Sequence, residues 1–443
     1  MGGLARIARE LGHRVSGCDA ALYPPMSEQL RDAGIDVIEG FGADQLSIRP
    51  DCFVVGNVVT RGNPLFEAIL DAGHRFTSGP QWVGEHVLPG RTVLAVAGTH
   101  GKTTTTSLLA WILERAGRSP GFLIGGVPVD FGASARRGSG APFVIEADEF
   151  DTALFDKRSK FVHYFPRIAI LNNLEYDHAD IFPDLAAIET QFHHLVRCVP
   201  ASGTLVVNGG DEALARVLAR GAWSRVERFA SPAGWHARAR PPGASLWRGE
   251  EEIGALQVPL DGAHNRDNAV AAIAAAVAAG VEPAMGLAAV AAFGGVRRRM
   301  ELRGTARGIR VYDDFAHHPT AIEATLAGLR ARAGTGRILA LLEPRSNTMK
   351  LGVMRARLAP SLREADLVFC LAPRSGPQAL GWDAAEALAP LGPRARVFAG
   401  IDELIEAVAR EARAGDEVIA MSNGAFGGVH GRLLEALSRT GAQ

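Results

Sequence analysis

Cysteine is scarce in this sequence, with four residues in 443, at Cys18, Cys52, Cys198 and Cys370. No two of them have the C-x-x-C spacing of a zinc or redox pair, and their scatter does not suggest a disulfide framework. The chain also lacks an apolar run long enough to span a membrane. We therefore expect a cytoplasmic protein with neither a signal peptide nor a membrane partner.

Excess charge of one sign is missing as well, because 47 lysines and arginines nearly balance 48 acidic residues. A chain without net charge has little electrostatic attraction for nucleic acid, so we expect no nucleic-acid partner. Lysine is also rare, since it occurs only at Lys102, Lys157, Lys160 and Lys350. The prior of about 150 residues per domain suggests about three domains. The oligomeric state is left open between a monomer and a weak homo-oligomer.

The clearest local pattern is an apolar run followed by a glycine-rich turn. Val93–Ala97 predicts a buried parallel strand, and Ser107–Ala116 predicts a helix that stops at Gly117. Glycines let backbone N–H groups face phosphate oxygens, and a helix N-terminus adds partial positive charge. The sequence therefore predicts a P-loop that binds ATP. Its candidate phosphate-binding residues are Gly98, Thr99, His100, Gly101, Lys102, Thr103 and Thr104.

The P-loop match is a variant of the strict pattern. Lys102 can reach the outer phosphates, and the Thr103 hydroxyl can bind Mg²⁺. However, Val96 stands where the strict pattern has a glycine, five residues before Gly101. The alternative is a Gly/Thr turn with an incidental lysine, which the strand and helix on either side disfavour.

Two further strand ends carry candidate metal ligands. Phe143–Ile145 runs into Glu146 and three more carboxylates, and Arg167–Leu171 leads to His178. Mg²⁺ prefers hard oxygen ligands close to phosphates. A solvated acidic loop and a structural histidine are the alternatives. Because both stretches end strands of a sheet with a phosphate cradle, we expect metal or phosphate ligands.

The N-terminal part, residues 1–89, predicts an α/β domain with loops at strand ends. Asp19 ends a strand where dinucleotide-type folds place a ribose-binding acid, although a solvated acid is the commoner case. Asn57, Thr60 and Ser78 lie in turns after later strands. No strand and glycine-rich turn precede the first helix, so we expect a start assigned too late or a truncated chain.

The rest of the chain adds polar groups on both sides of a hinge at Phe293–Gly295. Before it, Asn265 and Asn268 open an alanine-rich helix, where they cap the helix or bond a purine edge. After it, an arginine cluster precedes a strand that ends in acids and histidines. Polar loops also leave the strands 337–342 and 417–421. The candidates in this third domain are Arg299, Asp314, His317, Arg345, Asn347 and Asn423.

Five ordered motifs together resemble those of the Mur ligases: Gly98–Thr105, Glu146–Asp151, Asn172–His178, Gly262–Asn268 and Asp313–Pro319. The resemblance covers the whole chain apart from the missing first strand. Six further stretches are similar to the branch of the family that ligates a murein tripeptide: Met1–Leu4, Tyr23–Ser27, Ser78–Trp82, Phe155–His163, Glu343–Lys350 and Met421–Gly428.

The resemblance implies an α/β fold of three domains. These are a Rossmann-like domain for UDP-N-acetylmuramate at 1–89, a P-loop ATPase domain at 90–295 and a Rossmann-like, peptide-binding domain at 296–443. It implies an ATP- and Mg²⁺-dependent ligase that joins UDP-N-acetylmuramate to the recycled tripeptide L-alanyl-γ-D-glutamyl-meso-diaminopimelate through an acyl phosphate. The alternatives are the UDP-N-acetylmuramate–L-alanine ligase and a ligase-dead nucleotide binder, if the N-terminus is truncated.

The resemblance also implies residue roles. Lys102, Glu146 and His178 would be catalytic, with Thr103 and Glu146 on one Mg²⁺ and His178 on a second. The adenine would lie near Asn265 and Asn268, and the third domain would close over the nucleotide with Arg299, Asp314 and His317. Weaker expectations place the peptide at Arg345, Asn347 and Asn423, and the UDP-sugar at Asp19, Asn57, Thr60 and Ser78. The carbamylated lysine of several sister ligases is absent, because no lysine stands between Lys160 and Lys350.

Overall fold

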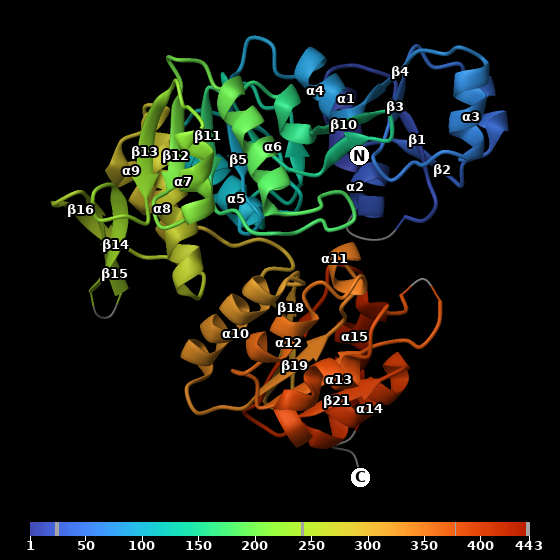
Figure 1. Cartoon of the computed structure of the whole chain (residues 1–443), viewed down its shortest axis with the longest axis vertical. Helices are drawn as coiled ribbons and strands as arrows, with labels where there is room; N and C mark the ends of the chain where they lie inside the picture. The colour runs from blue at the N-terminus through green and yellow to red at the C-terminus, as the bar shows by residue number, and fades with distance from the viewer. Residues whose placement is uncertain (23–25, 241–242, 377, 440–443) are drawn as a thin grey trace. The chain divides into compact units, whose positions relative to one another are not determined.

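A computed structural model describes residues 1–22, 26–240, 243–376 and 378–439 (Figure 1). The start of the family motif at Tyr23–Ser27 therefore lies outside the described residues. The chain divides into two compact units. The first contains Met1–Tyr176, Asp184–Pro259 and Asp267–Gly294, and the second contains Asp177–Pro183, Leu260–Arg266 and Gly295–Gln443. Among the described residues, no helix has both the length and the apolar character needed to cross a membrane.

The N-terminal part of the first unit contains two separate pairs of parallel strands. β1 pairs with β2, and β3 pairs with β4. Short helices connect and flank these strands. The elements in chain order are α1 (Gly2–Glu10), β1 (Ser16–Asp19), α2 (Met26–Asp32), β2 (Asp36–Glu39), η1 (Ala43–Ile48), β3 (Phe53–Val55), α3 (Pro64–Asp71), β4 (Phe76–Ser78) and α4 (Gly79–His86).

A ten-stranded sheet forms the core of the first unit, in the order β16-β15-β14-β13-β12-β11-β5-β8-β6-β7. Its centre, from β13 to β6, is parallel. The strands are β5 (Thr92–Ala97), β6 (Gly121–Leu123), β7 (Ala135–Arg136), β8 (Pro142–Glu146), β11 (Ile168–Leu171), β12 (Thr204–Asn208), β13 (Arg225–Phe229), β14 (Trp235–Arg240), β15 (Gly243–Arg248) and β16 (Glu251–Leu256). A separate antiparallel pair consists of β9 (Asp151–Ala153) and β10 (Asp156–Ser159), followed by η2 (Lys160–His163).

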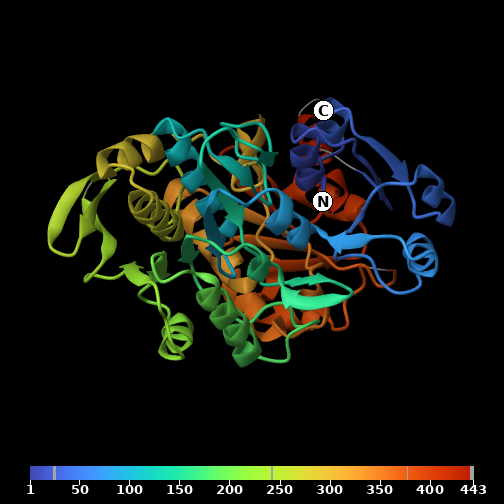
Figure 2. The same ribbon diagram turned by 90° about the horizontal axis from the view of Figure 1, so that it is seen from above.

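The connections in this sheet place helices on both faces (Figures 1 and 2). The chain moves one way along the sheet from β5 to β6 and the other way from β11 to β13. Because parallel crossovers are right-handed, α5 covers one face while α6 and α7 cover the other. α9 packs beside α5. The helices of this part of the unit are α5 (Lys102–Arg115), α6 (Leu185–Cys198), α7 (Glu212–Ala219), α8 (Ala263–Ala278) and α9 (Pro283–Ala291).

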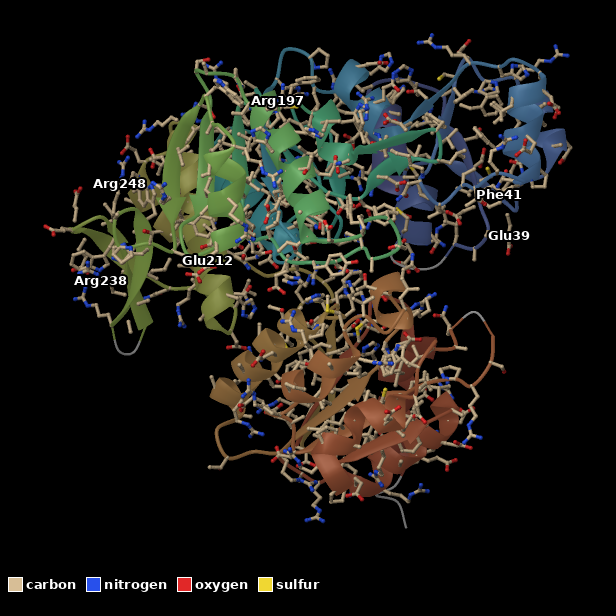
Figure 3. The ribbon with its side chains drawn as sticks, viewed as in Figure 1. Glu39, Phe41, Arg197, Glu212, Arg238 and Arg248 are labelled. Carbon is tan, nitrogen blue, oxygen red and sulfur yellow. The ribbon has the colours of Figure 1, made fainter. Side chains whose placement is uncertain are left out.

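The antiparallel extension of this sheet, β14 to β16, carries arginines stacked on tryptophans. The Arg238 guanidinium lies 3.9 Å from the centre of the Trp247 ring, and Arg248 lies 4.9 Å from that of Trp235. Figure 3 labels both arginines on this extension, Arg238 on β14 and Arg248 on β15. Each contact adds a cation–π attraction that stabilises the hairpins.

The second unit contains a six-stranded sheet in the order β17-β18-β22-β19-β20-β21. Only β17 runs antiparallel to its neighbour. The strands are β17 (Glu301–Ala306), β18 (Ile309–Asp314), β19 (Ile338–Leu342), β20 (Leu367–Leu371), β21 (Ala395–Phe398) and β22 (Glu417–Met421). The helices are α10 (Pro319–Ala333), α11 (Asn347–Lys350), α12 (Arg355–Ser361), α13 (Ala384–Leu388), η3 (Ala389–Arg394), α14 (Ile401–Glu411), η4 (Phe426–Gly428) and α15 (Val429–Arg439).

Right-handed crossovers again divide the helices of the second unit between two faces. α10, α12 and α13 pack side by side on one face, and α14 packs against α15 on the other. The core between the sheet and this second helix pair is apolar, with Val311, Leu341, Phe369 and Val418 all buried. The loops at the carboxyl ends of β18, β19 and β22 therefore extend from a well-packed sheet.

The predicted strands at 93–97, 143–145 and 337–342 are confirmed to within one or two residues. The helix predicted from Ser107 begins earlier, at Lys102. Its first turns contain four threonines, whose β-branched side chains lower helix propensity. All four are buried, and the Thr106 hydroxyl donates to the Lys102 carbonyl at 2.7 Å. Tertiary packing therefore overrides local preference.

The turn predicted to contain Ser78 is instead the start of a helix. Ser78 ends β4 and begins α4, and its hydroxyl accepts a hydrogen bond from the Gln81 N–H at 3.2 Å. Pro80 in the first helical turn has the fixed φ that a helix start favours. A serine two residues before a proline is a helix start signal, which the prediction of a turn missed.

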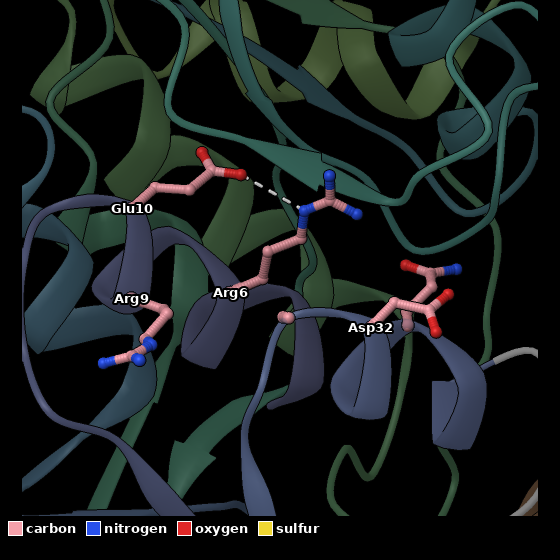
Figure 4. A pocket seen from close by; sticks show the side chains of 6 residues that line it. Arg6, Arg9, Glu10 and Asp32 are labelled. Atoms are coloured by element: carbon pink, nitrogen blue, oxygen red, sulfur yellow. Dashed lines mark hydrogen bonds and ion pairs between the residues drawn. The ribbon is translucent and has the colours of Figure 1, made fainter.

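A polar cavity of about 280 Å³ lies along α1 and α2 (Figure 4). In it the Arg6 Nε donates to the Glu10 carboxylate at 3.2 Å. The basic and acidic groups are equal in number, so they give an anion little net attraction. The residues that line it are Arg6, Arg9, Glu10, Gln29, Asp32 and Ala33.

Candidate functional site

The predicted P-loop connects the buried end of β5 to the start of α5. Gly98 has a φ of +148° and Gly101 a φ of +76°, backbone conformations that side-chain-bearing residues rarely adopt. A Cβ added to Gly101 would lie 2.6 Å from both the Asn172 Nδ2 and the Asn268 Oδ1. The turn therefore requires glycine for its conformation and for the close approach of two asparagines.

Residues after the neighbouring strand, β11, hold the P-loop in place. The Asn173 Oδ1 accepts a hydrogen bond from the His100 N–H at 2.7 Å. The Asn172 and Asn173 amides donate to the His100 carbonyl at 2.9 and 3.0 Å. The Thr99 hydroxyl accepts from the Glu175 N–H at 2.9 Å. This segment therefore satisfies the N–H and the carbonyl of His100 before any phosphate binds.

Lys102, the first residue of α5, lies among carboxylates. Its Nζ is 2.8 Å from the Glu149 carboxylate and 3.3 Å from the Asp148 carboxylate. Burial alone would lower the pKa of Lys102, but Glu149, Asp148 and Glu146 outweigh it and raise the pKa. The side chain is thus held as a cation beside the P-loop, as phosphate binding requires.

The next residue, Thr103, meets the acid at the end of β8. Its hydroxyl donates to the Glu146 carboxylate at 3.1 Å, and the second oxygen of Glu146 accepts from the Gly125 N–H at 2.8 Å. Oxygen donors of this kind suit Mg²⁺, and the carboxylates of Glu146, Asp148 and Glu149 outnumber the two lysines that pair with them, Lys102 and Lys160. This donor set fits a divalent cation beside a polyphosphate.

The two asparagines expected near the adenine lie within α8, which starts at Ala263, so the capping alternative is wrong. Asn268 is 4 % exposed, and its Oδ1 accepts a hydrogen bond from Asn172 at 2.9 Å. The Asn265 amide donates to the Asp261 carbonyl at 2.7 Å. Asn268 thus supports the P-loop, and a role of either residue at adenine stays a prediction.

His178 belongs to the second unit, within Asp177–Pro183. It has a φ of +54°. Its N–H donates to the Asp177 Oδ1 at 2.7 Å, and the Thr348 hydroxyl donates to the same oxygen at 2.6 Å. The Ala179 N–H donates to Thr348 Oγ1 at 3.3 Å. Residues of α11 therefore shape the backbone around the predicted second metal ligand.

His317 contributes to the same environment in the second unit. Burial would raise the pKa of Asp177, but His178, Thr348 and His317 outweigh it and lower that pKa to about 2. The His317 Nδ1 lies 2.9 Å from the Phe315 carbonyl, which places a proton on that nitrogen. The structure thus brings His178 and His317 near one carboxylate.

The arginines after the hinge stack on Phe315. The guanidinium carbons of Arg298 and Arg299 lie 5.2 and 5.0 Å from the ring centre. Arg298 Nη2 donates to the Ser422 and Gly424 carbonyls at 2.9 and 2.6 Å. The sequence singled out Arg299 and overlooked Arg298, which fixes the loop after β22.

Asp314 lies at the buried end of β18. Its carboxylate accepts hydrogen bonds from the Met300 and Ala316 N–H groups, both at 2.8 Å. Burial raises the pKa of Asp314 above its ordinary value. These bonds shape the turn around Phe315, so a direct contact with nucleotide stays a prediction.

The predicted peptide residues are gathered after β19 and β22. Arg345 Nη1 lies 3.9 Å from the Glu343 carboxylate, and the Ser422 hydroxyl donates to that carboxylate at 2.5 Å. The Asn347 amide donates to Asp180 at 2.8 Å. The Asn423 Oδ1 is buried and accepts no hydrogen bond from the described residues.

The predicted UDP-sugar residues differ in exposure. Asp19 and Thr60 are exposed, Asn57 is half-buried, and Ser78 is fully buried with its hydroxyl at the start of α4. The first three lie at or after strand ends, where α/β sheets place ligands. Their contacts with substrate stay a prediction.

Three family descriptions match this chain. The Mur ligase family catalytic domain matches residues 1–90, the Mur ligase middle domain matches 96–276, and the Mur ligase glutamate ligase domain matches 298–424. The chain therefore belongs to the Mur ligase family, and it is an ATP-dependent ligase with the three-domain α/β architecture of that family. The resemblance and the fold class are confirmed, while the boundaries at 89/90 and 295/296 stay a prediction.

Individual relatives cover nearly the whole chain. The chain is 52 % identical, over 99 % of its length and 96 % of the relative, to the UDP-N-acetylmuramate–L-alanyl-γ-D-glutamyl-meso-2,6-diaminoheptandioate ligase of Escherichia coli. It is 34 % identical, over 99 % of its length and 94 % of the relative, to a UDP-N-acetylmuramate–L-alanine ligase of Paenarthrobacter aurescens. A crystal structure of a murein peptide ligase from Psychrobacter arcticus superposes with a TM-score of 0.78 at 43 % identity, over 99 % of this chain and 96 % of that one.

Proposed function

We propose that this chain joins UDP-N-acetylmuramate to the tripeptide L-alanyl-γ-D-glutamyl-meso-diaminopimelate, with ATP and Mg²⁺, in peptidoglycan recycling. The observation that carries the proposal is the 52 % identity to the Escherichia coli ligase over 99 % of the chain. The site supports the same chemistry, because Lys102, Thr103 and Glu146 meet at one end of the P-loop.

The reaction would proceed through an activated carboxylate. The muramate carboxylate attacks the γ-phosphorus of ATP, which releases ADP and forms an acyl phosphate. The L-alanine amine of the tripeptide then attacks the acyl carbon, and the tetrahedral intermediate expels phosphate as the amide forms and the amine loses a proton. A free carboxylate is a poor acyl donor, so phosphorylation supplies the leaving group.

The residues of this chain would bind and orient the nucleotide. The P-loop amides and Lys102 would hold the phosphates, since Lys102 is kept cationic among carboxylates. Thr103 and Glu146 would hold one Mg²⁺ and His178 a second. Bound ions would neutralise charge on the transferred phosphoryl group.

Arg345 is the proposed anchor of the peptide. A tripeptide carries carboxylates that a single L-alanine lacks, and a planar guanidinium is a natural partner for them. The distance of 3.9 Å between Arg345 Nη1 and Glu343 is long for an ion pair, so the guanidinium keeps donors for a ligand. The buried Asn423 Oδ1 is a further acceptor in the adjacent loop.

A ligation assay with three acceptors tests the function. The chain is incubated with ATP, Mg²⁺ and UDP-N-acetylmuramate, and with tripeptide, L-alanine or buffer, and the products are identified by mass spectrometry. We expect UDP-N-acetylmuramoyl tripeptide and stoichiometric ADP. A Lys102→Ala variant should be inactive, and Lys157→Ala, which removes an exposed lysine paired with Asp151, is the matched control.

The other outcomes select the other hypotheses. Rapid turnover with L-alanine and none with tripeptide would establish the L-alanine ligase instead. Binding of ATP without ligation of either acceptor would indicate the ligase-dead nucleotide binder. Either result would reject the tripeptide ligase.

A further inference from the structure

The segment Glu343–Lys350 contacts two loops of the second unit at once. At its start, Glu343 accepts a hydrogen bond from Ser422, whose loop also contains Gly424. A Cβ on Gly424 would collide with the Arg345 guanidinium, so this side chain lies directly against the loop. At its end, α11 reaches the segment Asp177–Pro183. One short stretch therefore links the proposed peptide site to His178.

The buried part of the link at α11 is the Thr348 hydroxyl, while the exposed Asn347 amide bonds to Asp180. Thr348 is 3 % exposed and Asp177 is 7 % exposed. The Thr348 hydroxyl donates to the Asp177 Oδ1 and accepts from the Ala179 N–H, so it bonds on both sides of His178. Asp177 in turn accepts from the His178 N–H through the same oxygen.

His178 needs such support because its backbone is in the left-handed region. A residue with a Cβ is destabilised in that conformation, because its Cβ comes too close to the following carbonyl oxygen. It is retained only where surrounding contacts determine it. The Phe182 N–H also donates to the His178 carbonyl at 3.0 Å, which closes the turn from the other side. Thr348 supplies a buried contact that comes from outside the turn.

We propose that Thr348 is a positioning residue that couples the proposed peptide site to His178. A tripeptide that binds Arg345 orders the segment Glu343–Lys350. The hydrogen bonds of Thr348 to Asp177 and Ala179 then fix the backbone of His178. Metal binding at His178 and peptide binding at Arg345 then strengthen each other, because coupling between two sites is reciprocal. The inference rests on the proposed function for the identity of the peptide.

Binding of Mn²⁺ without turnover tests this coupling. The full chain is saturated with a non-hydrolysable ATP analogue and UDP-N-acetylmuramate, and free Mn²⁺ is followed by electron paramagnetic resonance with and without tripeptide. The binding event that is lost in His178→Ala is the one of interest. For the parent chain we expect tripeptide to tighten that event by about fivefold or more.

Three variants separate positioning from packing. Thr348→Val keeps the size and removes both hydrogen bonds, so the effect of tripeptide on Mn²⁺ affinity should fall below about twofold. Thr348→Ser keeps the hydroxyl and should retain the parent's coupling. Ser361→Ala removes a buried hydroxyl of the same unit that donates to the Leu358 carbonyl, and it should change nothing.

Several results would overturn the inference. Full coupling in Thr348→Val, lost coupling in Thr348→Ser, or no coupling in the parent would each do so. If Thr348→Val fails to fold, the parent and Thr348→Ser still decide the matter. Failure of the proposed function is recognised separately, because a chain that ligates tripeptide but shows no coupling refutes only the role of Thr348.

Discussion

The P-loop and the segment Glu343–Lys350 are both proposed to meet a substrate, yet they are held in different ways. Gly98 and Gly101 give the P-loop its conformation, and asparagines at the end of the adjacent strand satisfy its backbone. The segment Glu343–Lys350 depends on a carboxylate and a hydroxyl bonded to distant parts of the chain. Thr348 and Asp177, for example, are 171 positions apart. The glycines that set the P-loop conformation leave a local sequence pattern, whereas contacts with distant partners leave none.

The largest effect should come from the acid at the end of β8. Glu146→Ala removes an oxygen donor next to Thr103, and we expect ligation to fall more than about a hundredfold because charge on the transferred phosphoryl is no longer neutralised. The measurement is the ligation rate as a function of Mg²⁺, with the melting temperature as a control for folding. Near-normal turnover at low Mg²⁺ would contradict the assignment of Glu146.

Gly101→Ala tests the claim that local geometry fixes the P-loop. The added Cβ meets Asn172 and Asn268 at 2.6 Å, so we expect the Kd for ATP to rise by roughly tenfold or more. Gly90→Ala is a matched control, because Gly90 has the same φ of +76° with nothing within 4 Å of the added atom. Isothermal titration with ATP measures both. Equal losses of affinity would show that backbone strain, and not the collision at the P-loop, is responsible.

The comparison of the two loops explains how much the sequence could predict. The P-loop, Lys102 and Glu146 were found because each stands next to a strand or helix signal in its own segment. The fold class followed from the alternation of strand and helix patterns. Asn172 and Asn173 stand in a family motif that predicts no role for either, although their place after a strand beside the P-loop is a usable signal.

Residues that act across long sequence separations were missed. Thr348 and Arg298 have ordinary neighbours in the sequence, and their partners, Asp177 and Gly424, lie more than a hundred positions away. Contacts between such distant residues depend on which strands are neighbours in the sheet. Hydrophobic periodicity predicts the strands but not their order in the sheet. The start of α5 was missed for a related reason, since burial outweighed the low helix propensity of its threonines.

Arg345→Ala tests the segment Glu343–Lys350, which distant contacts hold, as the proposed peptide site. We expect kcat/KM for tripeptide to fall by roughly ten- to a hundredfold, the cost of one charge-assisted hydrogen bond, with the Kd for ATP little changed. Arg355→Ala removes an exposed arginine of the same unit and serves as the control. If kcat/KM for tripeptide equals that of the parent, Arg345 only braces Glu343, and the loop at Asn423 becomes the leading candidate.

The smallest effect concerns Cys370, which lies in the sheet from which the loops after β19 and β22 extend. The residue is fully buried on β20, and burial raises the pKa of its thiol to about 12. In the unfolded chain the thiol ionises near pH 8.5, so between those two pH values the unfolded state releases a proton that the folded state keeps. Stability is therefore lost as the pH rises, by about 1.4 kcal/mol at pH 9.5 relative to pH 7.5.

Replacing the thiol should remove that pH dependence. Cys370→Ala lowers stability at every pH because it leaves a cavity. Between pH 7.5 and 9.5, however, its free energy of unfolding should fall by about 1.4 kcal/mol less than that of the parent. Urea unfolding followed by fluorescence at the two pH values measures the difference. Parallel losses in parent and variant would mean that Cys370 ionises in the folded protein almost as easily as in water, and that the core beneath these loops is less tightly closed than its burial indicates.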